Sequence, residues 1–192
     1  MNKKHVIFAI AGRTSSGKSS IIKRVSHDLG LKQVHSYTTR LPRPTELIES
    51  DHIFINEDDI KQYQSQIVAY TEIGKAKYFC TRDQVFNADL YTLDPIGIKS
   101  LQSQQLEDLD IVVIYIVANL DVRTGRYIGR GNSIDEFIER NQKEDEQFSE
   151  FEEEKGYQIK INNSGEIEDA VKECEEFIEG YMEGMRWLQG TV

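Results

Sequence analysis

A glycine-rich segment near the N-terminus has the residue types and spacing of a phosphate-binding loop. Residues 12–19 read GRTSSGKS and satisfy the pattern G-x-x-x-x-G-K-[ST]. The two glycines let the backbone curl so that successive N–H groups point at a phosphate, and a helix beginning near Gly17 adds its positive dipole end. Lys18 can neutralise the β- and γ-phosphates, and the hydroxyl of Ser19 can ligate Mg²⁺. The alternative, an ordinary glycine turn into a capped helix, does not explain why all four fixed positions occur together.

The segment therefore predicts a nucleoside triphosphate site. The residues expected to contact the triphosphate are Gly12, Arg13, Thr14, Ser15, Ser16, Gly17, Lys18, Ser19 and Ser20.

Arginines gather in two further segments, although the chain carries a net charge of −10. Arg40 and Arg43 lie three residues apart on a loop stiffened by prolines, so they can grip a phosphate dianion together. Residues 123–130 contain three arginines and no acid. Local basic islands in an acidic protein indicate an anionic ligand, but composition alone does not exclude arginines that only decorate the surface.

Composition restricts the class of protein. A length of 192 residues suits one domain with a lobe inserted into it, and an apolar share of 39% is enough for a core. The acidic net charge argues against nonspecific nucleic-acid binding, and no apolar run is long enough to span a membrane. Two cysteines make neither a disulfide framework nor a metal site, so we expect a reducing, cytoplasmic location.

Hydrophobic runs and helical periodicities alternate along the chain. Residues 110–117 read DIVVIYIV, the most hydrophobic segment, and strands that are apolar on both faces are typical of parallel sheets covered by helices. The expected strands are 5–11, 32–36, 89–94, 110–117 and 157–161, and the expected helices are 17–29, 120–130, 133–154 and 165–188. This alternation predicts a doubly wound α/β core.

Residues 51–80 have a different pattern. The runs HIFI, IVAYTEI and KAKYFCT are short and strand-like, and EDDIKQY between them is typical of a short helix. Together with the preceding loop TTRLPRPTE, this stretch predicts a small α+β lobe inserted into the core.

Several motifs resemble the guanylate kinase family. SYTTRLPRPTE at residues 36–46 closely resembles its segment S-x-T-T-R-x-P-R-x-x-E, and DHIF at 51–54 stands where the family has D-Y-x-F. TLDPIGIK at 92–99 resembles the strand end D-x-D-x-Q-G-V-K, residues 114–130 resemble the strand and helix before an arginine-bearing lid, and INN at 161–163 resembles the end of the last strand. Many NTPases share the phosphate loop, whereas its combination with T-T-R-x-P-R is typical of a much narrower group of proteins. The resemblance covers nearly the whole chain.

The resemblance implies a three-layer α/β P-loop NTPase fold with a parallel central sheet, helices on both faces, a small inserted α+β acceptor-binding lobe and a helical lid. The chain would be a single domain over residues 1–192, with a core at 1–35 and 81–192, the acceptor lobe at 36–80 and the lid at about 126–142. The cofactors would be ATP and Mg²⁺, and the second partner a nucleoside monophosphate-like acceptor. A monomer and a homodimer both remain open.

The resemblance also assigns roles to individual residues. Lys18 and the lid arginines Arg126, Arg130 and Arg140 would act on the transferring phosphoryl group, and Ser19 would ligate Mg²⁺. The acceptor would be bound by Ser36, Arg40, Arg43, His52, Glu72, Tyr78 and Asp94. The lid arginines could instead pair with neighbouring glutamates on the helix surface, and Asp94 before Pro95 could simply cap a helix.

The departures from the family pattern cluster in the acceptor lobe. His52 replaces a tyrosine that touches the acceptor phosphate, and it could also be a structural histidine. The guanine-reading glutamate of the family falls on Ala69, and Glu72 is the nearest acid, three residues later. Such a shift moves a side chain to the other face of a strand unless a bulge intervenes, so the role of Glu72 as the guanine reader stays open.

These patterns predict an enzyme, a nucleoside monophosphate kinase that converts ATP and a monophosphate, GMP above others, into ADP and a diphosphate. One alternative is a kinase of the same fold with another small phosphorylated acceptor. A second is a non-catalytic nucleotide-binding protein, against which the intact phosphate loop argues.

Overall fold

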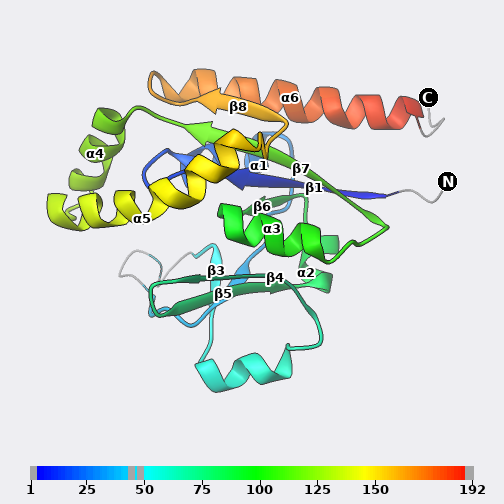
Figure 1. Cartoon of the computed structure of the whole chain (residues 1–192). Coiled ribbons are helices and arrows are strands. Elements are labelled where there is room, and N and C mark those ends of the chain that lie inside the picture. The colour runs from blue at the N-terminus through cyan, green and yellow to red at the C-terminus, as the bar shows by residue number, and fades with distance from the viewer. Residues whose placement is uncertain (1–3, 43–45, 47–49, 189–192) are drawn as a thin grey trace.

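A parallel four-stranded sheet forms the centre of the molecule (Figure 1). The computed structural model describes residues 4–42, 46 and 50–188. The strands run in the order β6 (Leu90–Thr92), β1 (His5–Ala11), β7 (Leu109–Val117) and β8 (Ile159–Asn162). The central position of β1 places the loop that follows it, residues 12–17, at the carboxyl edge of the sheet, where ligands of open α/β sheets bind.

Helices cover both faces of this sheet. One face packs against α1 (Lys18–Asp28) and α6 (Ile167–Leu188), and the other against α3 (Pro95–Ser103) and α5 (Ile134–Glu153). Strand β7 shows why both faces need cover, because Ile114 joins the cluster with α1 and α6 while Tyr115 joins the cluster with Phe148 of α5. The three-layer α/β fold predicted from the sequence is therefore confirmed.

The prediction of a strand at residues 32–36 is wrong in its extent. A single bridge joins Gln33 to Leu90, and the amide of Val34 donates to the carbonyl of Leu90 at 2.8 Å. Val34 is the one buried apolar residue of that segment, so little holds it on the central sheet. The chain instead leaves for a second sheet.

This second sheet builds the lobe, which lies below the core in Figure 1. Its strands run in the order β3 (His52–Phe54), β2 (Ser36–Thr38), β5 (Ala76–Thr81) and β4 (Ile67–Ile73). Tyr37 and Phe79 stack at 5.1 Å on the face that carries the 3-10 helix η2 (Glu57–Gln62), with Tyr63 4.4 Å from Tyr37. The opposite face of the lobe sheet is turned to the core.

Two short helices complete the described part of the chain. Helix α2 (Arg82–Phe86) returns the chain from the lobe to the core, and α4 (Leu120–Ile128) follows β7 and leads into α5. Sequence periodicity did not predict α2, which has only five residues. Among the described helices, none is long and apolar enough to cross a membrane.

The inner end of the lobe sheet is part of the core. Ala69 and Cys80 are fully buried in the same cluster as Ile98 and Leu101 of α3. Asp94 is the N-cap of α3 and follows β6 at the carboxyl edge of the central sheet. Packing of the lobe against α3 therefore brings the lobe beside that edge.

Packing of α5 against the sheet can be tested by truncating Phe148, which is 2% exposed and lies 5.7 Å from the ring of Tyr115. Phe148→Ala should lower the free energy of unfolding by about 3–5 kcal/mol in urea titrations, because a cavity is left in the core. Ile138→Ala on the same helix is the matched control. Its side chain is 48% exposed, so the loss should stay below about 1 kcal/mol. Equal losses would contradict the packing of α5.

Candidate active site

The phosphate loop packs closely against the ends of β7 and β8. A Cβ atom at Gly12 would lie 2.4 Å from the carbonyl oxygen of Ile116, and one at Gly17 would lie 2.0 Å from Nδ2 of Asn163. Gly17 also has a φ of +97°, and Ser15 has a φ of 61° in the same left-handed region. These conformations curl the loop, and the two glycines are required because no other residue fits so close to the strand ends.

The loop presents polar groups that the described part of the protein leaves unpaired. The hydroxyls of Ser15 and Ser16 are buried and have no partner there. Helix α1 begins at Lys18, and Gly17 before it supplies no side-chain cap. Amides at such a helix start, together with the positive end of the helix dipole, are suited to bind an anion.

Lys18 lies at the centre of the site. Its ammonium group donates to the carbonyl oxygens of Gly12 and Arg13, the latter at 3.1 Å. Burial lowers the pKa of Lys18 to about 8, while the carboxylates of Glu144 and Asp94 act to raise this pKa and Arg140 to lower it. These charges therefore come from the start of α3 and from α5.

Asp94 links the core to the lobe. Its Oδ1 accepts from the amide of Gly97 at 2.7 Å, which confirms the helix cap, and its Oδ2 accepts from the hydroxyl of Thr71 on β4 at 2.8 Å. Burial raises the pKa of Asp94, and the field of Lys18 acts against this rise. The carboxylate is thus both a cap and a group facing the phosphate loop.

Arg40 forms a polar cluster with Tyr78 and Glu46 on the lobe face turned to the core. Nε of Arg40 donates to the hydroxyl of Tyr78 at 3.2 Å, and its two terminal nitrogens donate to the carboxylate of Glu46 at 2.8 and 2.9 Å. This pairing with Glu46 raises the pKa of Arg40. Arg43 lies outside the described residues.

Ser36 and His52 stand beside this cluster on the paired strands β2 and β3. The hydroxyl of Ser36 lies 2.9 Å from Nδ1 of His52, and the tautomer of the imidazole decides which of them donates. The ring of His52 meets the ring of Tyr78 edge-on at 5.5 Å. The structure therefore brings together four of the residues expected to bind the acceptor.

Glu72 is not among them. Thr71 pairs across the sheet with Tyr78, and Glu72 pairs with Lys77, so Glu72 lies on the opposite, exposed face and accepts from the hydroxyl of Tyr70. A register shift does occur in β4, but it lies between Ile67 and Ala69 and so cannot turn Glu72 inward. The inward position nearest the core is the buried Ala69.

Two of the three lid arginines approach the loop. One guanidinium nitrogen of Arg126 donates to the carbonyl oxygen of Ser16 at 3.5 Å, and Nε of Arg140 lies 3.5 Å from a carboxylate oxygen of Glu144. Arg130 follows α4 and is exposed. The charge of Arg140 also acts to lower the pKa of Lys18.

Sequence reasoning missed the contacts between the loop and α5. Arg13 forms an ion pair with Asp145, and Thr14 contacts Glu144. Arg123, which is 5% exposed, donates to the side chain of Asn141 at 2.7 Å. The acid-free arginine segment was the available signal for Arg123, whereas no spacing rule links residue 14 to residue 144.

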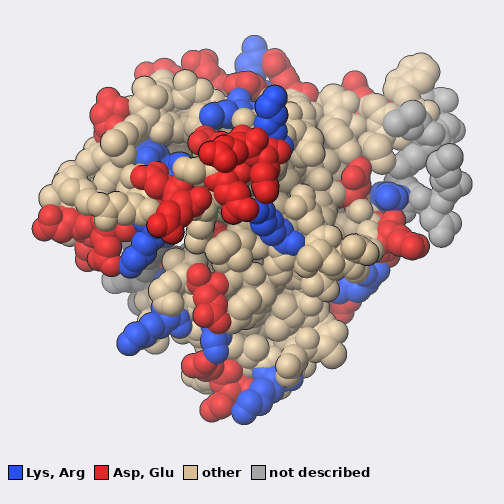
Figure 2. Space-filling model, viewed as in Figure 1, with Lys and Arg blue, Asp and Glu red and all other residues tan. Residues whose placement is uncertain are grey.

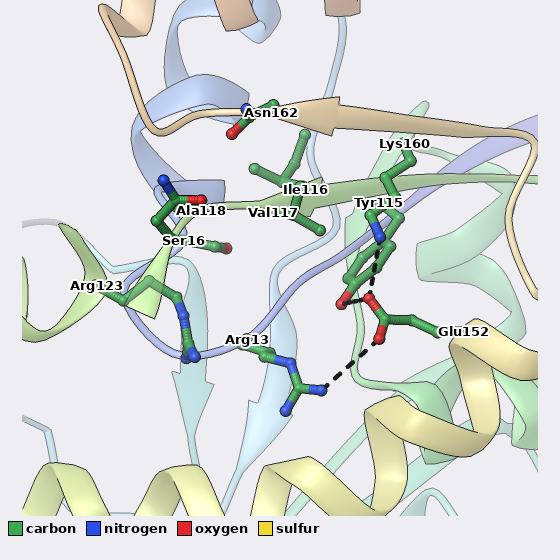
Figure 3. Close-up of a pocket in the computed structure, with 11 residues that line it drawn as sticks. Arg13, Ser16, Tyr115, Ile116, Val117, Ala118, Arg123, Glu152, Lys160 and Asn162 are labelled. Carbon is green, nitrogen blue, oxygen red and sulfur yellow. Dashed lines mark hydrogen bonds and ion pairs between the residues drawn. The ribbon is translucent and has the colours of Figure 1, made fainter. Parts of the chain in front are cut away.

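A cavity of about 490 Å³ opens beside the loop on the α5 side. Figure 3 shows Arg13, Tyr115 and Lys160 all directed at the carboxylate of Glu152. Arg13 and Ser16 of the loop line this cavity. The outer surface of α5 is strongly acidic (Figure 2), and its Glu150 pairs with Lys99 at 2.8 Å. Acids thus cover the outer surface of α5, while Arg13 and Arg123 lie on the side of the loop.

The residues present fit a magnesium ion held chiefly by a triphosphate. Ser19 lies exposed in the first turn of α1, next to Lys18. No group of three His, Cys, Asp or Glu side chains able to hold a metal occurs in the described ranges. Mg²⁺ keeps several waters and is commonly held by one or two protein oxygens plus substrate phosphates, so one hydroxyl at this place is sufficient.

Comparisons with known proteins agree with this geometry. The family model described as guanylate kinase matches residues 2–181. The chain is 35% identical over 81 residues to a guanylate kinase of Malacoplasma penetrans, an alignment that covers 40% of this chain and 41% of that protein. It is 30% identical over 162 residues to a uridine kinase of Bacillus pumilus, with 73% and 76% covered.

The fold also matches a solved structure. A guanylate kinase from Anaplasma phagocytophilum superposes with a TM-score of 0.65 at 19% identity, covering 93% of this chain and 87% of that one. This likeness shows the same fold, and the guanylate kinase family, whose model matches this chain, generally uses ATP and Mg²⁺.

The low pKa of Lys18 predicts a pH-dependent affinity for ATP. Below about pH 8 the amine is charged and attracts phosphate, and as pH rises through about 8 this attraction is lost. Calorimetric titrations should show affinity for ATP falling by about tenfold toward about pH 9.5, the value of one charge-assisted contact. Lys18→Ala should bind weakly throughout without this slope. A wild-type affinity that is flat over this range would contradict the charge assigned to Lys18.

Proposed function

Because this chain belongs to the guanylate kinase family, we propose that it transfers the γ-phosphoryl group of ATP to a nucleoside monophosphate. The products are ADP and a nucleoside diphosphate, and GMP is the acceptor that the family favours. The intact phosphate loop, with Gly12, Gly17, Lys18 and Ser19, supports an enzyme rather than a non-catalytic binding protein.

One continuous path of contacts carries this proposal. Asp94 influences the pKa of Lys18 on the donor side and accepts a hydrogen bond from Thr71 on the lobe side. Thr71 is the cross-strand partner of Tyr78, whose hydroxyl accepts from Arg40. Asp94, Thr71 and Tyr78 thus connect Lys18, the proposed cation for the donor phosphates, with Arg40, the proposed cation for the acceptor phosphate, and this supports an arrangement suited to direct phosphoryl transfer.

The residues act mainly by position and charge. Lys18 and the loop amides hold the triphosphate, and Arg40 holds the acceptor phosphate. Glu46 now occupies the planar edge of Arg40, so it keeps the guanidinium oriented until an acceptor phosphate takes its place. Arg126 and Arg140 approach from the lid and spread the charge of the transferring group. The hydroxyl of Ser19 would hold Mg²⁺ that enters with the triphosphate, and the ion would supply positive charge to neutralise the phosphates.

Closure of the lobe and the lid completes this arrangement. Movement of the lobe toward the loop would bring Arg40 to the γ-phosphate and exclude water, which otherwise competes as the acceptor.

A specific observation favours a second candidate, a kinase with a different phosphorylated acceptor. Guanine presents N1–H and an amino group, and a carboxylate accepts from both. Glu72 lies on the outer face of the lobe, and Asp94 already accepts from Gly97 and Thr71. Ala69, where the family has its glutamate, is packed in the core. Selection of guanine therefore lacks an evident carboxylate among the described residues.

A coupled assay of ADP release against a panel of monophosphates separates these functions. We expect turnover that depends on a monophosphate and is abolished in Lys18→Ala, because the neutral side chain no longer balances phosphate charge. The panel should include GMP, IMP, AMP, CMP and UMP. Preference for GMP over IMP, which lacks the amino group, supports the guanine assignment. Turnover with another acceptor alone rejects that assignment, and no turnover with any acceptor rejects the kinase.

Arg40→Ala should raise the KM for the acceptor by about 10- to 100-fold, because a charge-assisted contact of about 1.5–3 kcal/mol is lost. The KM for ATP should stay unchanged. Arg82→Ala is the matched control, since Arg82 pairs with Asp108 and lies over the ring of Phe86. Steady-state kinetics in both substrates gives the answer. An equal effect on both KM values would show that Arg40 does not belong to the acceptor side.

A further inference from the structure

Two neighbouring carboxylates of α5 hold two neighbouring residues of the phosphate loop. One oxygen of Glu144 accepts from the backbone amide of Thr14 at 2.8 Å, and the other accepts from the hydroxyl of Thr14 at 2.5 Å. The next residue, Asp145, pairs with Arg13. The side chain of Glu144 is 17% exposed. A half-buried carboxylate with a backbone amide as its partner is more than a surface ion pair.

Glu144 approaches the loop on the side of Lys18. The ammonium group of Lys18 contacts the carbonyl oxygens of Gly12 and Arg13, which immediately precede Thr14 in the chain. Among the charges around Lys18, Glu144 contributes most to raising its pKa. In loops of this type the lysine reaches the β- and γ-phosphates. The carboxylate is therefore on the γ-phosphate side of the donor site.

The donors around Glu144 are those that a phosphoryl oxygen would use. The carboxylate takes the amide and the hydroxyl of Thr14, and its Oε1 lies 3.5 Å from Nε of Arg140. Arg123 and Arg13 are further cations nearby, since Glu144 raises the pKa of Arg123 while Arg13 lowers it. The same set of donors, an amide, a hydroxyl and guanidinium groups, would also stabilise a γ-phosphoryl group.

We propose that Glu144 is a positioning residue whose carboxylate takes the place of a γ-phosphoryl oxygen at Thr14 and holds Arg140 beside it. A triphosphate donor displaces this carboxylate and takes over Arg140, whereas a diphosphate leaves the contact with Thr14 in place. This inference rests on the donor half of the proposed function and is independent of the acceptor.

The contact gives the site a way to distinguish the donor before transfer from the product after it. While the γ-phosphate is bound, two like charges compete for the same amide. Once the phosphoryl group has left, Glu144 returns to Thr14 and contacts the loop in place of the phosphate. The contact between Glu144 and Thr14 therefore lowers the affinity for ATP relative to ADP. It also favours the return of α5 to the loop after transfer.

The test is a pair of binding measurements on Glu144→Gln. The amide has nearly the same shape, carries no negative charge and can donate to a phosphate, so we expect affinity for ATP to increase by about tenfold. Affinity for ADP should change by less than about twofold, a factor worth only about 0.4 kcal/mol. Calorimetric titration of ATP and ADP, each with Mg²⁺, measures both values. Glu139→Gln is the matched control, because exposed Glu139 pairs with Lys143 on the same helix.

Two results would overturn the inference. If Glu144→Gln weakened ATP and ADP equally, the carboxylate would only tie α5 to the loop. If neither affinity changed, the carboxylate would not compete with the γ-phosphate. Should Glu144→Gln fold poorly in thermal denaturation, Glu144→Ala must give the same preference for ATP in the same titrations, and absence of that preference overturns the inference as well. Failure of every acceptor in the turnover assay would reject the proposed function without affecting these binding results.

Discussion

The close fit of the phosphate loop against the ends of β7 and β8 is the constraint on which the site depends. Asn163, at the end of β8, is fully buried and donates to the carbonyl oxygen of Ser16 at 2.7 Å. Gly17 leaves room for this side chain, and a Cβ atom there would collide with it. The loop is therefore shaped by two strands distant in sequence as well as by its own glycines. A rigid, curled backbone can stabilise a phosphate without reorganising when the ligand arrives.

The attachment of the lobe follows from a second link at the same edge of the sheet. Asp94 caps α3 and accepts from Thr71, so one carboxylate fixes both the start of a core helix and the position of β4. The inner end of the lobe sheet is buried against α3, while its outer end carries Arg40 and Tyr78. The end of the lobe near the core is therefore the one fixed by packing.

Charge is distributed so that an acidic protein can still bind a polyanion. The acids of α5 either pair with cations away from the loop, as Glu150 does with Lys99, or contact the loop, as Asp145, itself 53% exposed, does in its ion pair with Arg13. Inward acids keep the buried arginines compensated, because an uncompensated buried charge is costly. A phosphate ligand can replace such an acid at little electrostatic cost, since one anion is exchanged for another. Glu144 at Thr14 is the sharpest case.

The sequence by itself determined the triphosphate loop, the α/β layers and the family, because these depend on local spacing and hydrophobic periodicity. Gly12 to Ser19 needed no tertiary information, and β7 was evident from its apolar run. Only the tertiary structure decided which face of β4 carries Glu72, because the strand is regular from Ala69 onward and residues three apart then lie on opposite faces. It alone brought Glu144 to Thr14, because contacts between residues so far apart in sequence depend on how a helix packs against a sheet.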